Sequence, residues 1–118
     1  MLRQRTQLLL ILFVLSAALH FFKLSEPRHV VFDEVHFGGF INDYHDGRLF
    51  FDIHPPHAKL LLAGVAVAGG YRGDQDFKKI GAPITKVSPA LLRLVPAIAG
   101  TLIPLALFCF LIQLGASP

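Results

Sequence analysis

The chain has 118 residues, of which 53% are hydrophobic and only 16% are charged. A soluble domain of this size cannot bury so much apolar surface, so the composition predicts a membrane protein or part of one. The formal net charge of +3 comes from dispersed basic residues, which argues against a nucleic-acid-binding surface, and the single cysteine, Cys109, excludes a disulfide framework.

The first candidate span is an apolar run over residues 8–22, which follows Arg3 and Arg5. At about 1.5 Å per residue this run nearly crosses a hydrocarbon core of about 30 Å, which predicts a transmembrane helix. A cleaved signal peptide has a similar pattern, with the small residues 16–18 as its cleavage site, and cleavage there would release a secreted metal-binding peptide as a further alternative. Basic residues before a first helix favour a cytoplasmic N-terminus, so the following loop is expected to face the periplasm, the exterior or the ER lumen.

A second apolar run covers residues 94–112 and contains no charged side chain. Its Pro96, Gly100 and Pro104 are tolerated in a bilayer, where neighbouring helices restore lost backbone partners. This run therefore predicts a second transmembrane helix.

The expected fold is an all-α membrane protein with two transmembrane helices joined by a long external loop. We expect a tail and first span over 1–24, an external loop over 25–88 and a second span over 89–118. Within the loop, the apolar spacing of residues 37–44 predicts an amphipathic helix. The apolar stretch 59–68, which ends at Gly69, is too short to span and predicts a second helix lying along the membrane surface.

Two adjacent acids, Asp33 and Glu34, are the first candidates for chemistry. Their side chains cannot face each other in a strand or a helix, so they are not expected to act as a facing pair. One carboxylate could act as a general base toward a hydroxyl group. Capping of the following helix explains the same residues equally well.

Basic groups and histidines accompany the acids. His54 precedes Pro55 and Pro56, which predicts a rigid corner at the start of a helix. Arg93, at the edge of the second span, is expected either to pair with a phosphate or to anchor the helix at the interface. The histidines and acids of the loop lack the spacing of a known metal motif, so no metal is expected.

The chain resembles a known family in three segments: 32–39 (FDEVHFGG), 50–60 (FFDIHPPHAKL) and 92–97 (LRLVPA). These segments are similar to the N-terminal part of the protein O-mannosyltransferases, glycosyltransferase family 39. The resemblance implies a C-type membrane glycosyltransferase (GT-C) whose first external loop carries an acidic motif.

Further implications of the resemblance are the transfer of a mannosyl-type sugar from a polyprenyl or dolichyl phosphate to Ser or Thr hydroxyls of secretory proteins, with inversion. It implies that Asp33 is the base and that Glu34 positions the acceptor or the loop. Arg93 and Lys59 are candidates for the donor phosphate, with His54 shaping the pocket. No cofactor besides the lipid-linked donor is expected.

Members of that family carry many more spans, so the chain is expected to be an N-terminal fragment that cannot turn over alone. The expected setting is a multi-pass protein of a bacterial plasma membrane or the ER membrane, with a homologous subunit as a possible dimer partner. The alternative is a small non-catalytic membrane subunit or binding module that uses the loop for partner contacts.

Overall fold

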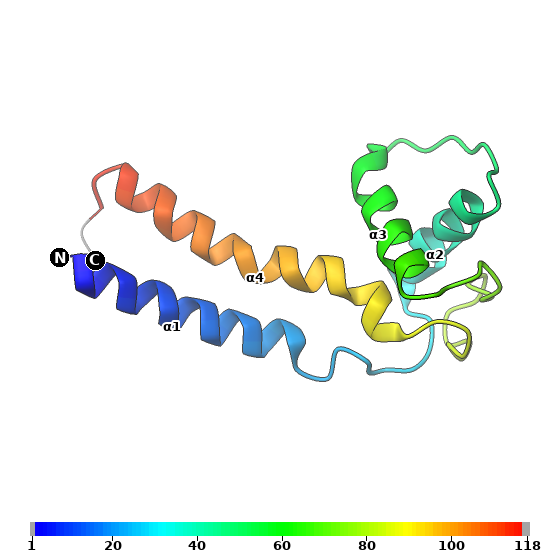
Figure 1. The fold of residues 1–118 in the computed structure, drawn as a ribbon, viewed down its shortest axis with the longest axis horizontal. Helices are drawn as coiled ribbons and strands as arrows, with labels where there is room; N and C mark the ends of the chain where they lie inside the picture. The colour runs from blue at the N-terminus through cyan, green and yellow to red at the C-terminus, as the bar shows by residue number, and fades with distance from the viewer. Residues whose placement is uncertain (1, 117–118) are drawn as a thin grey trace. The chain divides into compact units, whose positions relative to one another are not determined.

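The computed structural model describes residues 2–116 and contains four α-helices: α1 (Leu2–Phe21), α2 (Phe32–His45), α3 (Pro56–Ala68) and α4 (Pro89–Gln113) (Figure 1). Within these residues the only β-type pairing is an isolated bridge between His29 and Pro83. The predicted all-α class is confirmed. The chain divides into two compact units, residues 1–24 with 96–118 and residues 25–95, which are described in turn.

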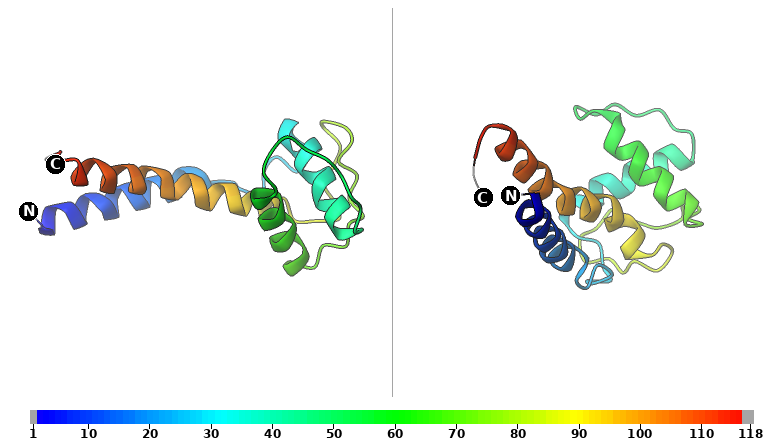
Figure 2. Two further views of the ribbon diagram at one scale, coloured as in Figure 1. Left: turned by 90° about the horizontal axis from the view of Figure 1, so that it is seen from above. Right: turned by 60° about the vertical axis from the view of Figure 1, so that its left-hand side comes forward.

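The first unit holds α1 and most of α4, which lie side by side in Figures 1 and 2. Both helices are long and apolar enough to cross a membrane. Each begins several residues before the apolar run that predicted it, because Arg3 to Gln7 and residues 89–93 also adopt helical backbone. Most of their large apolar side chains are exposed, as expected for surfaces that face lipid.

A close contact joins α1 and α4 at Gly100. A Cβ atom added to Gly100 would overlap the imidazole ring of His20, so only glycine allows this approach. The ring Nδ1 of His20 donates to the carbonyl oxygen of Ser16 at 2.8 Å, and Thr101 donates to the carbonyl oxygen of Ala97 at 2.8 Å. These polar groups are thus satisfied within their own helices, which a hydrocarbon environment requires.

The second unit is built around α2 and α3, which pack against each other. α2 is longer than the helix expected over 37–44 because it already begins at Phe32. α3 begins at Pro56 after an extended Pro55 and ends at the cap residue Gly69, which confirms the predicted corner and stop. The shared core consists of buried apolar side chains from both helices and from the segments around them: Val30, Ile41, Leu62, Ala63, Ala66, Tyr71, Phe77, Ile84, Val87 and Leu92.

The connector between α3 and α4 is ordered by one buried side chain, Gln75, which is 5% exposed. Its Oε1 accepts the backbone N–H groups of Thr85 and Lys86 at 2.9 and 3.0 Å. Its Nε2 donates to the carbonyl oxygens of Asp76 and Pro83. All polar atoms of the buried amide are therefore hydrogen-bonded, and these bonds hold the parts of the connector together around Gln75.

Tyr71 and Asn42 tie this connector to α2. The Tyr71 hydroxyl donates to Asn42 Oδ1 and accepts the backbone N–H of Gln75 at 2.9 Å, while Asn42 Nδ2 donates to the Gln75 carbonyl oxygen at 2.9 Å. Burial raises the pKa of the Tyr71 hydroxyl, so it stays protonated as a donor. This network, which no sequence motif indicated, gives α2 a rigid support on one side.

Candidate active site

Asp33 occupies the first turn of α2, where backbone N–H groups point outward and a carboxylate is stabilised by the positive end of the helix. The residue is exposed. Within residues 2–116 its carboxylate makes no hydrogen bond or ion pair. Asp33 is therefore a carboxylate on a fixed helical backbone that is open to a partner from outside the unit.

Glu34, the next residue, is held on both carboxylate oxygens. Its Oε2 accepts the backbone N–H of Val31 at 2.9 Å, which caps the start of α2. Its Oε1 accepts from Arg93 Nε at 2.7 Å, and Arg93 Nη2 lies 3.3 Å from Oε2. The two side chains are only 12% and 14% exposed. The capping interpretation thus holds for Glu34, and the same contacts lock the first turn of α2 onto the start of α4.

A second charged cluster surrounds Asp52 in the loop between α2 and α3. Lys59 Nζ donates to Asp52 and to the carbonyl oxygen of His54, and it is only 3% exposed. His54 Nδ1 lies 3.3 Å from the other Asp52 oxygen, and its side chain is 67% exposed. The hydrogen bond from Lys59 is the main reason that the pKa of Asp52 lies below its usual range.

Aromatic rings complete the surroundings of Lys59. Its Nζ lies 4.8 Å from the centre of the Phe40 ring and 5.7 Å from that of Phe50, within the range of cation–π attraction. Phe40 and Phe50 stack with their centres 4.9 Å apart, and Tyr44 meets Phe50 edge-on. A buried ammonium with one carboxylate, one carbonyl oxygen and two ring faces is well compensated, so it fixes the loop to α2 and α3.

In the loop between α2 and α3, the side chains of residues 49–53 alternate between partly buried and exposed. Phe50 and Asp52 are partly buried, whereas Leu49, Phe51 and Ile53 are almost fully exposed. A cavity of about 220 Å³ opens beside this stretch and is lined by Asp52, His54 and Lys59 among others. His54 is the candidate in this cluster that a ligand can reach most easily.

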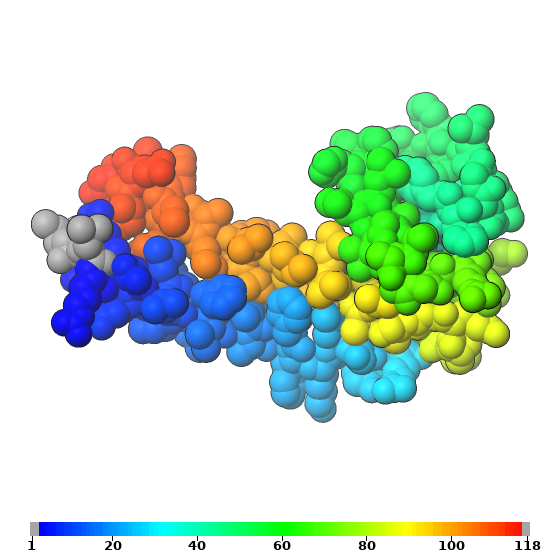
Figure 3. All heavy atoms as spheres, in the orientation of Figure 1, coloured from blue at the N-terminus to red at the C-terminus, as the bar shows by residue number. Residues whose placement is uncertain are grey.

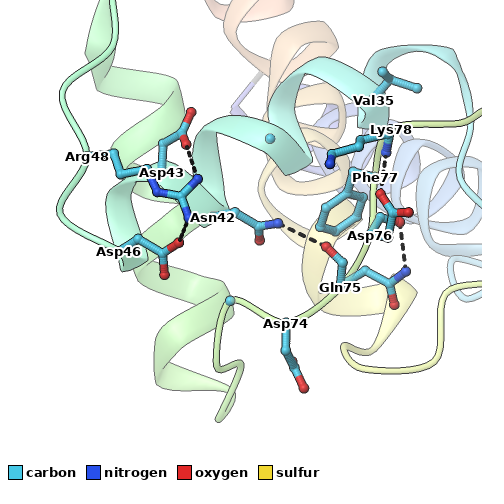
Figure 4. A pocket seen from close by; sticks show the side chains of 12 residues that line it. Val35, Asn42, Asp43, Asp46, Arg48, Asp74, Gln75, Asp76, Phe77 and Lys78 are labelled. Carbon is cyan, nitrogen blue, oxygen red and sulfur yellow. Dashed lines mark hydrogen bonds and ion pairs between the residues drawn. The ribbon is translucent and has the colours of Figure 1, made fainter.

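A larger cavity of about 580 Å³ lies between α2 and the connector (Figure 4). Four aspartates line it: Asp43, Asp46, Asp74 and Asp76. Arg48 reaches Asp46 at 2.7 Å and Asp43 at 3.8 Å, which neutralises part of the charge. Asp74 points away from the other labelled side chains in Figure 4. No group of three potential metal ligands forms a site among residues 2–116.

The predicted site residues thus fall into two clusters on the second unit. Asp33 and Glu34 lie at the start of α2 with Arg93, whereas Lys59 and His54 meet Asp52 at the start of α3. The cationic groups of Arg93 and Lys59 are both engaged by carboxylates. Asp52 was missed as a partner of Lys59, although the two lie seven residues apart around the His-Pro-Pro corner.

Comparison with known proteins defines the class. Residues 10–118 match the family model described as PMT, dolichyl-phosphate-mannose-protein mannosyltransferase. The chain belongs to this family, which together with its two apolar helices makes it a membrane protein.

Individual relatives are also named as mannosyltransferases. The chain is 48% identical over 90 residues to dolichyl-phosphate-mannose-protein mannosyltransferase 1 of Saccharomyces cerevisiae, an alignment that covers 75% of this chain and 11% of the relative. It is 40% identical over 103 residues to protein O-mannosyltransferase 1 of Drosophila melanogaster, covering 86% of this chain and 12% of the relative. A third relative, dolichyl-phosphate-mannose-protein mannosyltransferase 4 of Schizosaccharomyces pombe, is 44% identical over 104 residues, covering 86% and 13%.

The chain therefore spans only 11 to 13% of the length of these relatives. No solved structure matches it.

Proposed function

We propose that this chain is the catalytic-loop portion of a membrane protein O-mannosyltransferase. The reaction would transfer a mannosyl-type sugar from a dolichyl or other polyprenyl phosphate to a Ser or Thr hydroxyl of a protein. The observation that carries the proposal is the first turn of α2, where an exposed Asp33 stands beside a Glu34 that is held by Arg93 and by the Val31 N–H. Family membership supplies the reaction class.

In the proposed step, the Asp33 carboxylate takes the proton of the acceptor hydroxyl. The acceptor oxygen forms a bond to the anomeric carbon while the bond from that carbon to the phosphate oxygen breaks. The electron pair leaves with the lipid phosphate, and attack from the opposite face inverts the anomeric centre. A phosphate leaving group needs charge stabilisation more than a proton, so one base is enough.

Glu34 and Arg93 act as positioning residues in this scheme. Because both oxygens of Glu34 are already occupied, the proposed role of Glu34 is to fix the backbone that carries Asp33. Arg93 remains a candidate for the donor phosphate, and a phosphate would have to share its guanidinium with Glu34. In the proposed contact, Arg93 therefore binds the phosphate while it stays paired with Glu34.

Lys59 and His54 are proposed to face the donor from the second cluster. Lys59 is buried and bound to Asp52, so its contribution would be a fixed positive charge behind the loop. His54 is the accessible member, and its ring could donate to a phosphate oxygen. No cofactor beyond the lipid-linked donor is part of the proposal.

The proposed setting is the ER membrane or a bacterial plasma membrane, with residues 25–88 on the lumenal or external side. Arg3 and Arg5 before the first span support this orientation. Pairing with a homologous subunit is part of the same proposal. The alternative of a non-catalytic subunit is not favoured, because the relatives carry the names of transferases.

The proposal is tested by transfer of mannose from a polyprenyl phosphate to a Ser/Thr peptide by the full-length protein. Asp33→Asn should lower the rate at least about 100-fold, which is the usual lower range for loss of a general base. Asp43→Asn, a matched change on the same helix, should leave the rate within about twofold, since no role in proton transfer is proposed for it. Unchanged transfer by a folded Asp33→Asn variant would remove the base from the mechanism.

A further inference from the structure

The second unit contains another large cavity, of about 740 Å³, away from the candidate catalytic residues. It lies where the segment before α2 meets the segment before α4. The two segments are joined by backbone hydrogen bonds from Ile84 to Arg28, from Val30 to Ala82 and from Gly81 to Val30. Figure 3 shows the cyan residues of the first segment against the yellow residues of the second.

Two cationic side chains, Arg28 and Lys86, line this cavity, and none of the other described residues that line it is acidic. Arg28 has one exposed partner, Glu26, at 3.3 Å, and such surface pairs contribute little. The Lys86 ammonium makes no ion pair or hydrogen bond within residues 2–116. The cavity is thus positively charged, in contrast to the aspartate-lined cavity of Figure 4.

The cation-bearing wall is held in place. The backbone N–H of Lys86 is donated to the buried Gln75 amide, and Arg28 lies on the segment that pairs with residues 81–84. Ser88 and Pro89 line the same cavity at the start of α4, a 25-residue helix whose first turn favours an anion. A hydroxyl, two cations and the positive end of a helix therefore point to phosphate as the preferred chemistry.

Apolar side chains share the lining of this cavity with the polar ones, and few residues separate Arg28 and Lys86 from the candidate spans in the sequence. Ile84, Val87 and Leu91 contribute apolar side chains. Arg28 follows the last residue of α1 by seven positions and Lys86 precedes α4 by three, so at about 3.5 Å per residue neither is far from the end of a span. A ligand that combines a phosphate with an apolar body, and that is found at a membrane surface, fits all of these features.

We propose that the cavity around Arg28 and Lys86 binds the phosphate of a membrane lipid and so fastens the second unit to the bilayer surface. The phosphate can come from an anionic phospholipid headgroup or from a polyprenyl phosphate. No residue placed in the catalytic cluster lines the cavity, so the proposed lipid site does not depend on the residue assigned as the base.

The test is lipid binding to the full-length protein in a non-ionic detergent, measured by native mass spectrometry. The probes are dioleoylphosphatidylglycerol, dioleoylphosphatidylcholine and a polyprenyl phosphate. We expect the dissociation constant for phosphatidylglycerol to rise at least tenfold in R28Q/K86Q. The matched double variant K78Q/K79Q, whose lysines lie outside this cavity, should bind like the wild type.

The comparison of the lipid probes identifies the source of the phosphate. Preference for polyprenyl phosphate, lost in R28Q/K86Q, would assign the site to that lipid, whereas preference for phosphatidylglycerol would assign it to the bulk membrane. Equal dissociation constants in R28Q/K86Q and the wild type, or equal losses in both double variants, would overturn the proposal. So would displacement by inorganic phosphate as readily as by either lipid.

A single variant controls for loss of the fold in the double variant. Lys86→Gln removes an exposed side chain that has no partner within the described residues, so it should keep the fold and still weaken binding severalfold. Lipid binding is measured without turnover, so its result does not depend on the base assigned to the reaction. A failure of this proposal is therefore separate from a failure of the proposed mechanism.

Discussion

Arg93 and Glu34, 59 residues apart in the sequence, form a salt bridge in which Arg93 Nε donates to Glu34 Oε1 at 2.7 Å. The bridge connects the start of α4 with the first turn of α2, beside the exposed Asp33. Because both partners are largely buried, removing either one leaves a charge without compensation. The position of the proposed base therefore depends on a contact that is remote in sequence.

The first prediction concerns this pair. Glu34→Gln and Arg93→Gln should each lower the free energy of unfolding, and the double variant should be less unstable than the sum of the two. We expect a coupling of about 1–3 kcal/mol, as for other groups in direct contact. Equilibrium unfolding of the four proteins in the same detergent measures it. Additive losses would show that the two side chains do not support each other.

A second prediction follows from the lowered pKa of Asp52. A carboxyl whose pKa is lower in the folded than in the unfolded state stabilises the fold above the unfolded value, and this stabilisation is lost as the pH falls through the folded value. The unfolded reference is 3.8, so the loop should remain ordered at pH 5 and loosen below pH 3.8.

Carboxyl NMR of Asp52 should give a midpoint below 3.8, and Lys59→Gln should raise it because the main donor is lost. Amide hydrogen exchange over residues 49–54 reports the loosening. A midpoint that is the same with and without Lys59 would contradict the assigned cause.

The third prediction compares two adjacent glycines of α2. A Cβ atom on Gly38 would overlap the Phe77 ring, whereas nothing lies within 4 Å of the corresponding position on Gly39. Gly38→Ala should destabilise the second unit by about 1–3 kcal/mol through overpacking. Gly39→Ala should be neutral or stabilise by up to about 1 kcal/mol, because alanine favours helix. Thermal unfolding followed by circular dichroism distinguishes them, and equal melting points would contradict the packing described here.

Much of this architecture is readable from the sequence. The two apolar runs, the His-Pro-Pro corner and Gly69 each act locally, so α1, α3 and α4, and both ends of α3, could be expected. The start of α2 was placed too late, because Gly38 and Gly39 weaken the helical pattern while Phe77 and Arg93, both far along the chain, stabilise it.

The site was predicted less completely than the fold. The acids and basic groups were found by residue type and by resemblance, but their partners were not. The contacts from Glu34 to Arg93 and from Gln75 to residues 83–86 join segments whose separation carries no periodic signal. Such pairs become visible only when the chain is folded.

The most direct test of the role proposed for Asp33 is the side of the membrane on which this residue lies. In a full-length protein whose cysteines, Cys109 included, are replaced by serine, Asp33→Cys should react with a membrane-impermeant maleimide from the lumenal or external side, and Arg3→Cys should react only from the cytosol. Reaction of Asp33→Cys from the cytosol would contradict the account, as would protection from both sides in a protein that reacts once denatured.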